Sequence, residues 1–405
     1  MKEILLSLLG QEQEFQQYTP VLQEFESLHP GYHVKIEPMS WEEAWGKLFN
    51  YTIHGEGPQV SEIVSNWSNV LVGMNALRPF RPPEIEKLGG QDAFFPAAWK
   101  STHLSDESAI WSLPFGVNTY GVMYRRDLLA KAGIDEQTAF LTPTSFAETV
   151  QCLSDSGVQA PFLMAGDYFH ILLLHVIASW VWAMGGDYVS ADEHLVLFNR
   201  PEARAGIKAW FELYGQIAPP YRALTDDEVN KKFLKGESAI LIDDMGNGMR
   251  IAEEGIHASP HVRDSLGMAA MPGVPFVGGT NLVVWQHASY GPGGEMLAVE
   301  LASYLASYQG QRMIRKVVYP LPARKDVLPF LDYPNETIKA SVERTLQAGR
   351  PHNEVRHWTR IETQLGKTLA EIAKAVLAHP GQDLDAILDE FLSSLEQRLN
   401  LTLNS

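Results

Sequence analysis

The residues IWSLPFGVNTYGVMY, at positions 110–124, decide how we divide this chain. They form two strand-like halves that are interrupted at Pro114 and Gly116. Because Pro and Gly break regular strand pairing, such a segment can pass from one lobe of a protein to another. We therefore predict two lobes and interpret this stretch as a crossing between them.

The residues before the crossing alternate between strand and helix patterns. Short apolar or alternating runs at 4–9, 32–36 and 60–65 predict strands. Helical periodicity at 13–29 and 40–54 predicts a helix between each pair of strands, and Pro or Gly follows each helix. This strand–helix–strand order predicts a mostly parallel sheet covered by helices.

Helical periodicity dominates the residues after the crossing. It extends over 145–256 and returns in two long segments near 293–316 and 354–399. Strand patterns at 239–242 and 278–285 separate these helical parts. No internal repeat or low-complexity tract is present. We therefore predict an α/β protein and not a repeat array.

Composition restricts the class of partner. The 405 residues carry a formal net charge of −17, which on average repels phosphate backbones and anionic lipids, so we expect no nucleic-acid partner. Cys152 is the only cysteine, which excludes a disulfide-stapled fold and a cysteine-based metal site. The longest apolar stretch, 171–186, is shorter than the roughly 18–20 residues of a membrane span. We expect it to form a buried helix.

Four stretches of the chain, in order, resemble bacterial extracellular solute-binding proteins of family 1, the sugar-uptake group that includes the maltose-binding protein. Each motif is weak alone, but together, at family-like spacing, they cover nearly the whole chain. They are LHPGYHV (28–34); WSLPF (111–115) with MYRRDLLAKAGI (123–134) and PTSF (143–146); FLKGESAIL (233–241); and PG (272–273) with GGTNLVV (278–284).

The resemblance implies a two-lobed fold of the type II periplasmic-binding-protein class. Each lobe is expected to hold a mostly parallel sheet flanked by helices. The chain would then cross between lobes near residues 116, 267 and 322. This predicts an N-terminal lobe of residues 1–116 and 268–322, and a C-terminal lobe of residues 117–267 and 323–405.

The resemblance also implies a function. We expect a monomeric receptor, without catalysis or cofactor, that closes by a hinge on a sugar or oligosaccharide and delivers it to the permease subunits of an ABC transporter. Family members are exported, although residues 1–10 are unlike a secretory signal. We therefore expect a periplasmic or cell-surface protein whose signal is absent from this sequence. The alternative is a cytoplasmic sugar sensor with the same fold.

A sugar site needs flat rings for the C–H faces of the sugar and polar groups for its hydroxyls. Sites in open α/β sheets form at the carboxyl ends of strands. The candidates are therefore polar and aromatic residues that follow predicted strands or line the crossings. The family resemblance supports some of these positions as ligand contacts. They are Gln11, Glu12, Trp41, Asn66, Trp67, Asn118, Tyr120, Trp182, Asp243, Asp244, Gly279, Thr280, Asn281, Arg324 and Trp358.

Other interpretations stay open. Trp41 can be a packing residue at a helix start, and Asp243 and Asp244 can cap the segment that follows them. A glycoside-active enzyme needs two carboxylates about 5–10 Å apart, and no recognisable motif pairs them here. A metal site is disfavoured because Pro30 and Gly31 separate His29 from His33.

Overall fold

The computed structural model describes residues 2–10, 15–16, 18–104, 108–165, 170–192, 194–217, 221, 224–254, 257–291, 293–315, 321–353, 355, 357–379 and 381–403. The chain divides into two compact units. Unit 1 comprises residues 1–118, 277–332 and 354–356, and unit 2 comprises residues 119–276, 333–353 and 357–405.

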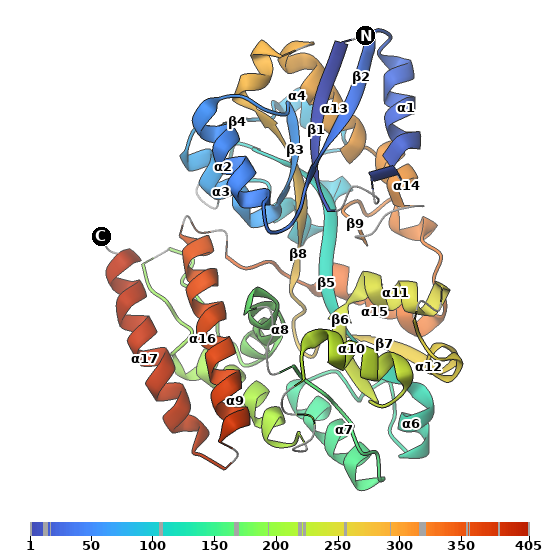
Figure 1. The fold of residues 1–405 in the computed structure, drawn as a ribbon, viewed down its shortest axis with the longest axis vertical. Helices are drawn as coiled ribbons and strands as arrows, with labels where there is room; N and C mark the ends of the chain where they lie inside the picture. Colours follow the sequence, from blue (N-terminus) through green and yellow to red (C-terminus); the bar gives the residue numbers. More distant parts are fainter. Residues whose placement is uncertain are drawn as a thin grey trace. The chain divides into compact units, whose positions relative to one another are not determined.

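Unit 1 contains most of the strands (Figure 1). In chain order it has β1 (Lys2–Leu9), α1 (Thr19–Leu28), β2 (Tyr32–Met39), α2 (Ala44–His54), β3 (Val60–Val64), the 3₁₀ helix η2 (Ser65–Trp67), α3 (Ser68–Gly73), β4 (Leu77–Arg78), α4 (Pro82–Lys87), α5 (Pro96–Lys100), the first half of β5 (Leu113–Arg125), β8 (Val277–Trp285), α13 (Gly294–Ala306), α14 (Tyr308–Arg315) and β9 (Leu321–Pro322).

Unit 2 is mostly helical. It has the second half of β5, α6 (Arg126–Lys131), α7 (Pro143–Asp155), α8 (His170–Ala183), α9 (Pro201–Gly215), α10 (Asp226–Lys235), β6 (Ile240–Asp244), α11 (Met245–Glu254), α12 (Pro260–Ser265), β7 (Leu266–Ala270), α15 (Glu336–Ala348), α16 (Trp358–Ala378) and α17 (Leu384–Leu403).

The sheet of unit 1 has the order β2-β1-β3-β8. Strand β1 pairs in parallel with β2 and with β3, as the strand–helix–strand pattern predicted. Strand β8 is antiparallel to β3 because it enters after a long excursion of the chain through unit 2. The carboxyl ends of β1, β2 and β3 therefore meet at one edge of this sheet.

The sheet of unit 2 differs from the sequence prediction. Strand β5 lies between β6 and β7 and is antiparallel to both, with Val122 opposite Ile242 and Ala269. The prediction of a mostly parallel sheet was therefore wrong for this ladder. Strands β6 and β7 do run in the same direction, but β5 enters from unit 1 and separates them. Since β7 pairs with β5, it belongs to unit 2, whereas the sequence assigned residues from 268 onward to the first lobe.

An apolar core holds α2 and α3 against the sheet of unit 1. Leu48 from α2 and Leu71 from α3 are fully buried against Ile63 and Trp285. The indole Nε1 of Trp285 donates to Ser61 Oγ at 2.7 Å, so the polar atom of this buried ring is satisfied. This core fixes the strand ends from which η2 begins.

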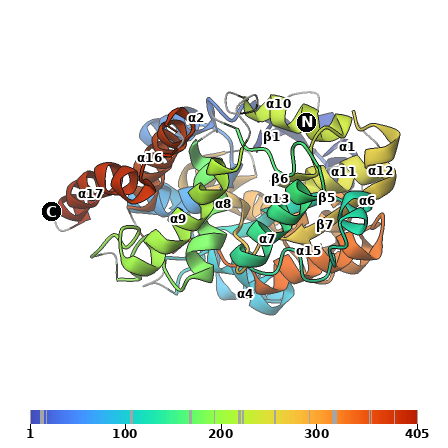
Figure 2. The same ribbon diagram turned by 90° about the horizontal axis from the view of Figure 1, so that it is seen from below.

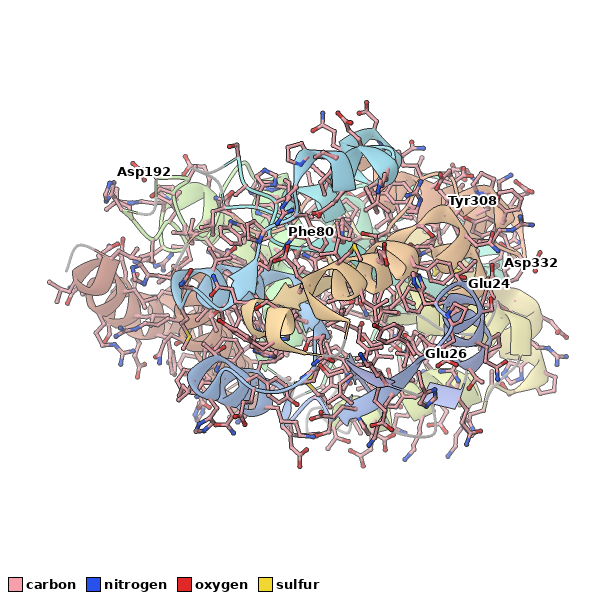
Figure 3. All side chains as sticks on the ribbon, turned by 90° about the horizontal axis from the view of Figure 1, so that it is seen from above. Glu24, Glu26, Phe80, Asp192, Tyr308 and Asp332 are labelled. Carbon is pink, nitrogen blue, oxygen red and sulfur yellow. The ribbon has the colours of Figure 1, made fainter. Side chains whose placement is uncertain are left out.

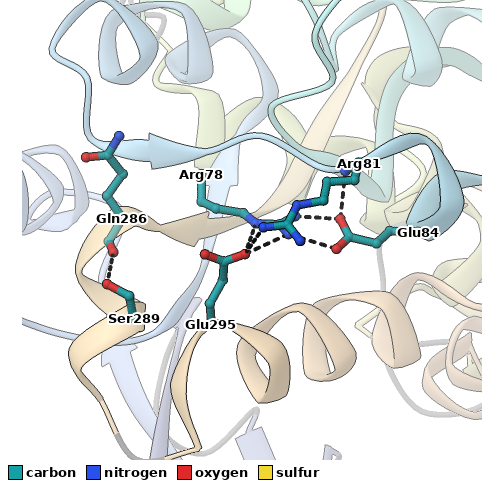
Figure 4. A network of polar contacts seen from close by, with 6 residues as sticks. All are labelled: Arg78, Arg81, Glu84, Gln286, Ser289 and Glu295. Carbon is teal, nitrogen blue, oxygen red and sulfur yellow. Dashed lines mark hydrogen bonds and ion pairs between the residues drawn. The ribbon is translucent and has the colours of Figure 1, made fainter.

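Helix α1 is tied to β2 by one carboxylate. Glu26, which is labelled in Figure 3, belongs to α1. It accepts a hydrogen bond from the backbone N–H of Val34 at 2.8 Å and lies 2.8 Å from Nδ1 of His33. On another part of unit 1, the buried guanidinium of Arg78 donates to Glu84 at 2.8 Å and to Glu295 at 2.9 Å (Figure 4). This network joins β4, α4 and α13.

Helices α8, α9, α16 and α17 pack together in unit 2 (Figure 2). Helix α8 confirms the predicted buried helix at 171–186. Gly206 of α9 allows close packing, since a Cβ atom there would lie 2.5 Å from Val181 Cα. The predicted helix near 354–399 is two helices, because the sequence Pro380-Gly381 interrupts it. Within the described part of the chain, no helix combines the length and apolarity needed to cross a bilayer.

Candidate functional site

Tryptophan residues follow the carboxyl ends of β2 and β3 in unit 1. Trp41 follows β2 and is 57% exposed. Trp67 ends η2, directly after β3, and is partly buried. Its ring meets the ring of Trp45 edge-on, with centroids 5.3 Å apart. Asn66 lies in the same 3₁₀ helix, so three predicted residues and one that was not predicted share this region.

Glu62 lies in the middle of β3 and its side chain contacts the end of β1, and the sequence prediction missed it. Its side chain is 4% exposed and its Oε2 accepts a hydrogen bond from the backbone N–H of Leu9 at 3.0 Å. Burial raises the pKa of this carboxyl to about 7, although the neighbouring Thr280 side chain and the hydrogen bond from Leu9 act in the opposite direction. A carboxyl that is so costly to ionise, next to candidate ligand contacts, is a feature that functional sites often have.

The predicted residues Gly279, Thr280 and Asn281 lie within strand β8 and pack within unit 1. A Cβ atom at Gly279 would lie 2.0 Å from the carbonyl oxygen of Gly116, and φ is +150°. The amide Nδ2 of Asn281 donates to Ser101 and, at 2.9 Å, to Ser112 Oγ. The glycine thus permits a close approach of β8 to β5, and the Asn281 side chain is fully engaged. Thr280 is buried.

Two more predicted residues of unit 1 lie near crossings of the chain. Arg324 is 5% exposed and pairs with Asp326 at 2.7 Å, and its guanidinium lies over the ring of Phe94. Its charge is therefore already compensated inside the unit. Asn118 is half-buried on β5. Gln11 and Glu12 lie outside the described residues.

The predicted aromatic residues of unit 2 converge on a pair of histidines. His175 Nδ1 and His352 Nε2 lie 2.9 Å apart. Trp358 stacks on His352 with a centroid distance of 4.3 Å, and the ring of Trp182 lies 5.4 Å from it. Tyr120 stacks near His175 at 6.4 Å. We call this group of five residues the histidine cluster.

The two histidines are neutral at neutral pH. Burial lowers the pKa of His175 to about 3, and burial together with His175 and Arg350 lowers the pKa of His352 well below its ordinary value. Nδ1 of His352 is buried with no hydrogen-bond partner among the described residues. Glu362 lies beside the cluster and accepts a hydrogen bond from Trp358 Nε1 at 3.2 Å.

Trp182 belongs to a polar network as well as to the cluster. Its Nε1 donates to Asp187 Oδ1 at 3.2 Å, and the guanidinium of Arg350 lies 4.5 Å from the centre of its ring. Arg350 also pairs with Asp187 at 2.6 Å. Trp182 is 6% exposed and Trp358 is 2% exposed, so both are packed within unit 2. Their contact with a ligand stays a prediction.

Asp243 and Asp244 end β6, opposite the second half of β5. Tyr120 is the cross-strand neighbour of Asp244. Asp244 Oδ1 accepts a hydrogen bond from the backbone N–H of Gly246 at 2.8 Å, so it caps the start of α11. Burial raises the pKa of Asp243 to about 7, and the charges of Asp244 and Asp226 add to this effect. The strand end therefore brings a second hard-to-ionise carboxyl near the histidine cluster.

The structure thus places five predicted residues of unit 2 in one region, and three of unit 1 in another. The sequence missed Trp45, Glu62, His175 and His352. The histidines lie far apart in sequence, and only the packing of α8 against the segment before α16 brings them together. No group of three or more His, Cys, Asp or Glu side chains is arranged to hold a metal ion in the described ranges.

Comparison with known proteins assigns the family. A family model described as bacterial extracellular solute-binding protein matches residues 21–345. The chain belongs to this family. This is a family of solute-binding proteins and not a class of enzymes, and it is described as extracellular.

This solute-binding protein also matches one curated relative over part of its length. It is 27% identical over 112 residues to the putative ABC transporter periplasmic-binding protein YcjN of Escherichia coli. The match covers 28% of this chain and 26% of that relative, so the chain aligns with only about a quarter of it.

Solved structures show the same fold over the whole length. The sugar-binding protein MalE of Xanthomonas citri has a TM-score of 0.81 at 18% identity, covering 99% of this chain and 97% of that one. A Thermotoga lettingae ABC transporter solute-binding protein bound with α-D-tagatose has a TM-score of 0.77 at 17% identity, with both chains fully covered. Maltose-bound MalE3 of Thermotoga maritima has a TM-score of 0.74 at 19% identity, with 99% of each chain covered. At such identities the likeness establishes the type II fold.

Proposed function

We propose that this solute-binding protein captures a sugar or oligosaccharide and delivers it to the permease subunits of an ABC transporter, outside the cytoplasmic membrane and without catalysis. The observation that carries the proposal is that Trp41 follows the carboxyl end of β2 while Asn66 and Trp67 follow that of β3, at one edge of the sheet of unit 1. Rings of this kind stack on the C–H faces of a sugar, and the amide can bond its hydroxyls. The sugar ligands named for similar structures support this choice.

The proposal includes residues of both units. In unit 2, Tyr120, Asp243 and Asp244 lie at neighbouring strand positions, and a carboxylate can accept hydrogen bonds from two sugar hydroxyls. Trp182 and Trp358 supply further rings in the histidine cluster. We propose that one sugar contacts both groups when the hinge closes, as in other two-domain binding proteins.

A thermal-shift screen against mono- and oligosaccharides tests the proposal. A ligand that binds only the folded state adds about 2.7 kcal/mol of stability at a hundredfold excess over its dissociation constant. At least one sugar should therefore raise the melting temperature by several degrees. A screen in which only metal ions or peptides raise it would contradict the proposed ligand class.

Matched variants then test the two groups of residues. Trp67→Ala and Asp244→Asn should each weaken binding of the same sugar. The Asn side chain keeps an oxygen that can cap α11, so loss of binding would not reflect loss of the cap. Tyr290→Ala and Asp264→Asn are the controls, because both side chains are exposed and lie outside the candidate regions. Equal binding by all four variants would exclude these residues from the site.

A further inference from the structure

Unit 1 carries a pocket whose described lining includes none of the candidate sugar-site residues. It has a volume of about 600 Å³, within the usual range of roughly 300–1,000 Å³ for small-molecule sites. It is lined from α5, from the segments that flank this helix, and from Lys325. Because the lining belongs to unit 1 alone, the pocket does not depend on any residue of unit 2.

Backbone hydrogen bonds form the walls of this pocket. Phe95 N donates to the carbonyl of Ala323 at 3.0 Å, and Lys325 N donates to the carbonyl of Ala93 at 2.9 Å. The Lys325 ammonium then reaches the carbonyl of Asp92 at 3.2 Å. Two segments distant in sequence are thereby paired, so the position of Lys325 on the pocket wall is fixed before any ligand binds.

The pocket has an aromatic wall. Trp99 lines it, is partly exposed, and stacks on the fully buried ring of Phe94 with centroids 5.7 Å apart. Phe94 is in turn covered by the guanidinium of Arg324, at 5.2 Å from the ring centre. Trp99 is therefore held rigidly from behind. A rigid, partly exposed indole offers a flat apolar surface to a ring.

The described lining of the pocket includes two lysines. Lys100 and Lys325 line it, and neither forms an ion pair with a residue that the structure describes. Asp92 is the one carboxylate among the lining residues that the structure describes. His103 also lines the pocket, and burial, followed by the charge of Lys100, lowers its pKa. Two lysines without an ion pair among the described residues, in the same pocket lining as an indole, favour an anionic ligand.

We propose that this pocket binds a small ring-bearing organic anion, with its ring on Trp99 and its anionic group held by Lys100 and Lys325. A carboxylate and a phosphate monoester share this chemistry. A neutral sugar would use neither lysine charge, so the pocket and the proposed sugar site select different ligands. The pocket would give this receptor a second ligand class.

Calorimetric titration of the full chain at low salt tests the proposal with three probes of similar ring size. Benzoate and phenyl phosphate carry the two kinds of anionic group, and benzamide is the neutral control. At least one anion should bind about tenfold or more tightly than benzamide, and binding should weaken as salt is raised. Whichever anion binds more tightly identifies the preferred group.

Variants locate the binding. Lys100→Ala combined with Lys325→Ala should weaken anion binding about tenfold, since each exposed ion pair contributes up to about a factor of five. The matched control, Lys87→Ala with Lys131→Ala, removes two exposed lysines outside the pocket and should change nothing. Trp99→Leu should weaken all three probes.

The proposal is overturned if neither anion binds at 10 mM, if benzamide binds as tightly as the anions, or if the Lys100/Lys325 variant binds them unchanged. Because both lysines are exposed, this variant should keep the wild-type melting temperature. The result therefore does not depend on Trp99→Leu remaining folded.

Discussion

Replacing Glu62 with Gln should stabilise the protein at high pH and leave its stability nearly unchanged in acid. Burial raises the pKa of this carboxyl from its ordinary 4.5 to about 7. Each pKa unit corresponds to about 1.4 kcal/mol. Ionised Glu62 therefore costs the folded state on the order of 3 kcal/mol at pH 8.

The direction of the effect follows from proton linkage. The folded state has the higher pKa, so between pH 7 and 4.5 it binds more protons than the unfolded state, and acid relieves the cost. The neutral amide of Glu62→Gln avoids the cost at every pH and keeps an oxygen to accept the hydrogen bond from Leu9. Its advantage over the wild type should be about 1–3 kcal/mol at pH 8 and below about 1 kcal/mol at pH 5.

Urea unfolding followed by circular dichroism at pH 5, 6, 7 and 8 measures this difference. Glu86→Gln is the control, because Glu86 is exposed on α4 and should show a small difference that is independent of pH. A Glu62→Gln variant that is less stable than the wild type at pH 8, or whose difference does not change with pH, would refute the assignment of Glu62 as a costly buried carboxylate.

Three other substitutions probe interactions inside the individual units. His175→Gln should lower the free energy of unfolding at pH 7 by about 1–3 kcal/mol. This deficit should shrink by up to about 1.4 kcal/mol per pH unit below 6.5, because the wild-type histidine stays neutral in the folded state and takes up a proton in the unfolded state. Urea titrations from pH 7 to 5 measure the deficit. Gly279→Ala should lower the stability measured by thermal unfolding by about 2 kcal/mol or more, because the added Cβ would meet a backbone oxygen. Gly46→Ala, whose added Cβ has open space in α2, should raise the stability by up to about 1 kcal/mol. Arg78→Ala should cost about 3 kcal/mol in thermal unfolding, because it leaves two partly buried carboxylates without a counter-charge. Arg81→Ala, at an exposed position, should cost under about 1 kcal/mol. Equal costs would contradict this account of the network in Figure 4.

Much of unit 1 could be predicted because its early elements follow one another locally. Strands β1, β2 and β3 are separated by helices that end at Gly or Pro, so periodicity and turn residues define them without knowledge of distant contacts. Trp41 and Trp67 could be placed near the ends of these strands from sequence because each follows one of them, and their contact with a ligand stays a prediction. The sheet of unit 2 was harder, since its central strand comes from a segment that begins in unit 1.

The histidine cluster could not be predicted from sequence for a related reason. His175 lies in an apolar helix, where an isolated histidine is usually a packing residue, and His352 lies in a segment without regular secondary structure. Their hydrogen bond joins residues 177 positions apart. No local pattern reports such a pairing. Glu62 was missed because one acidic residue in a short apolar strand resembles a solvent-facing position until burial is known.

Isothermal titration calorimetry with a panel of mono- and oligosaccharides, with the sugar analysed after each titration, tests the central claim most directly. We predict saturable one-to-one binding of at least one sugar, which is recovered chemically unchanged. If no sugar in the panel binds, the proposed ligand class is wrong. If the bound sugar is recovered as cleaved or transferred product, the protein is an enzyme and the receptor proposal fails.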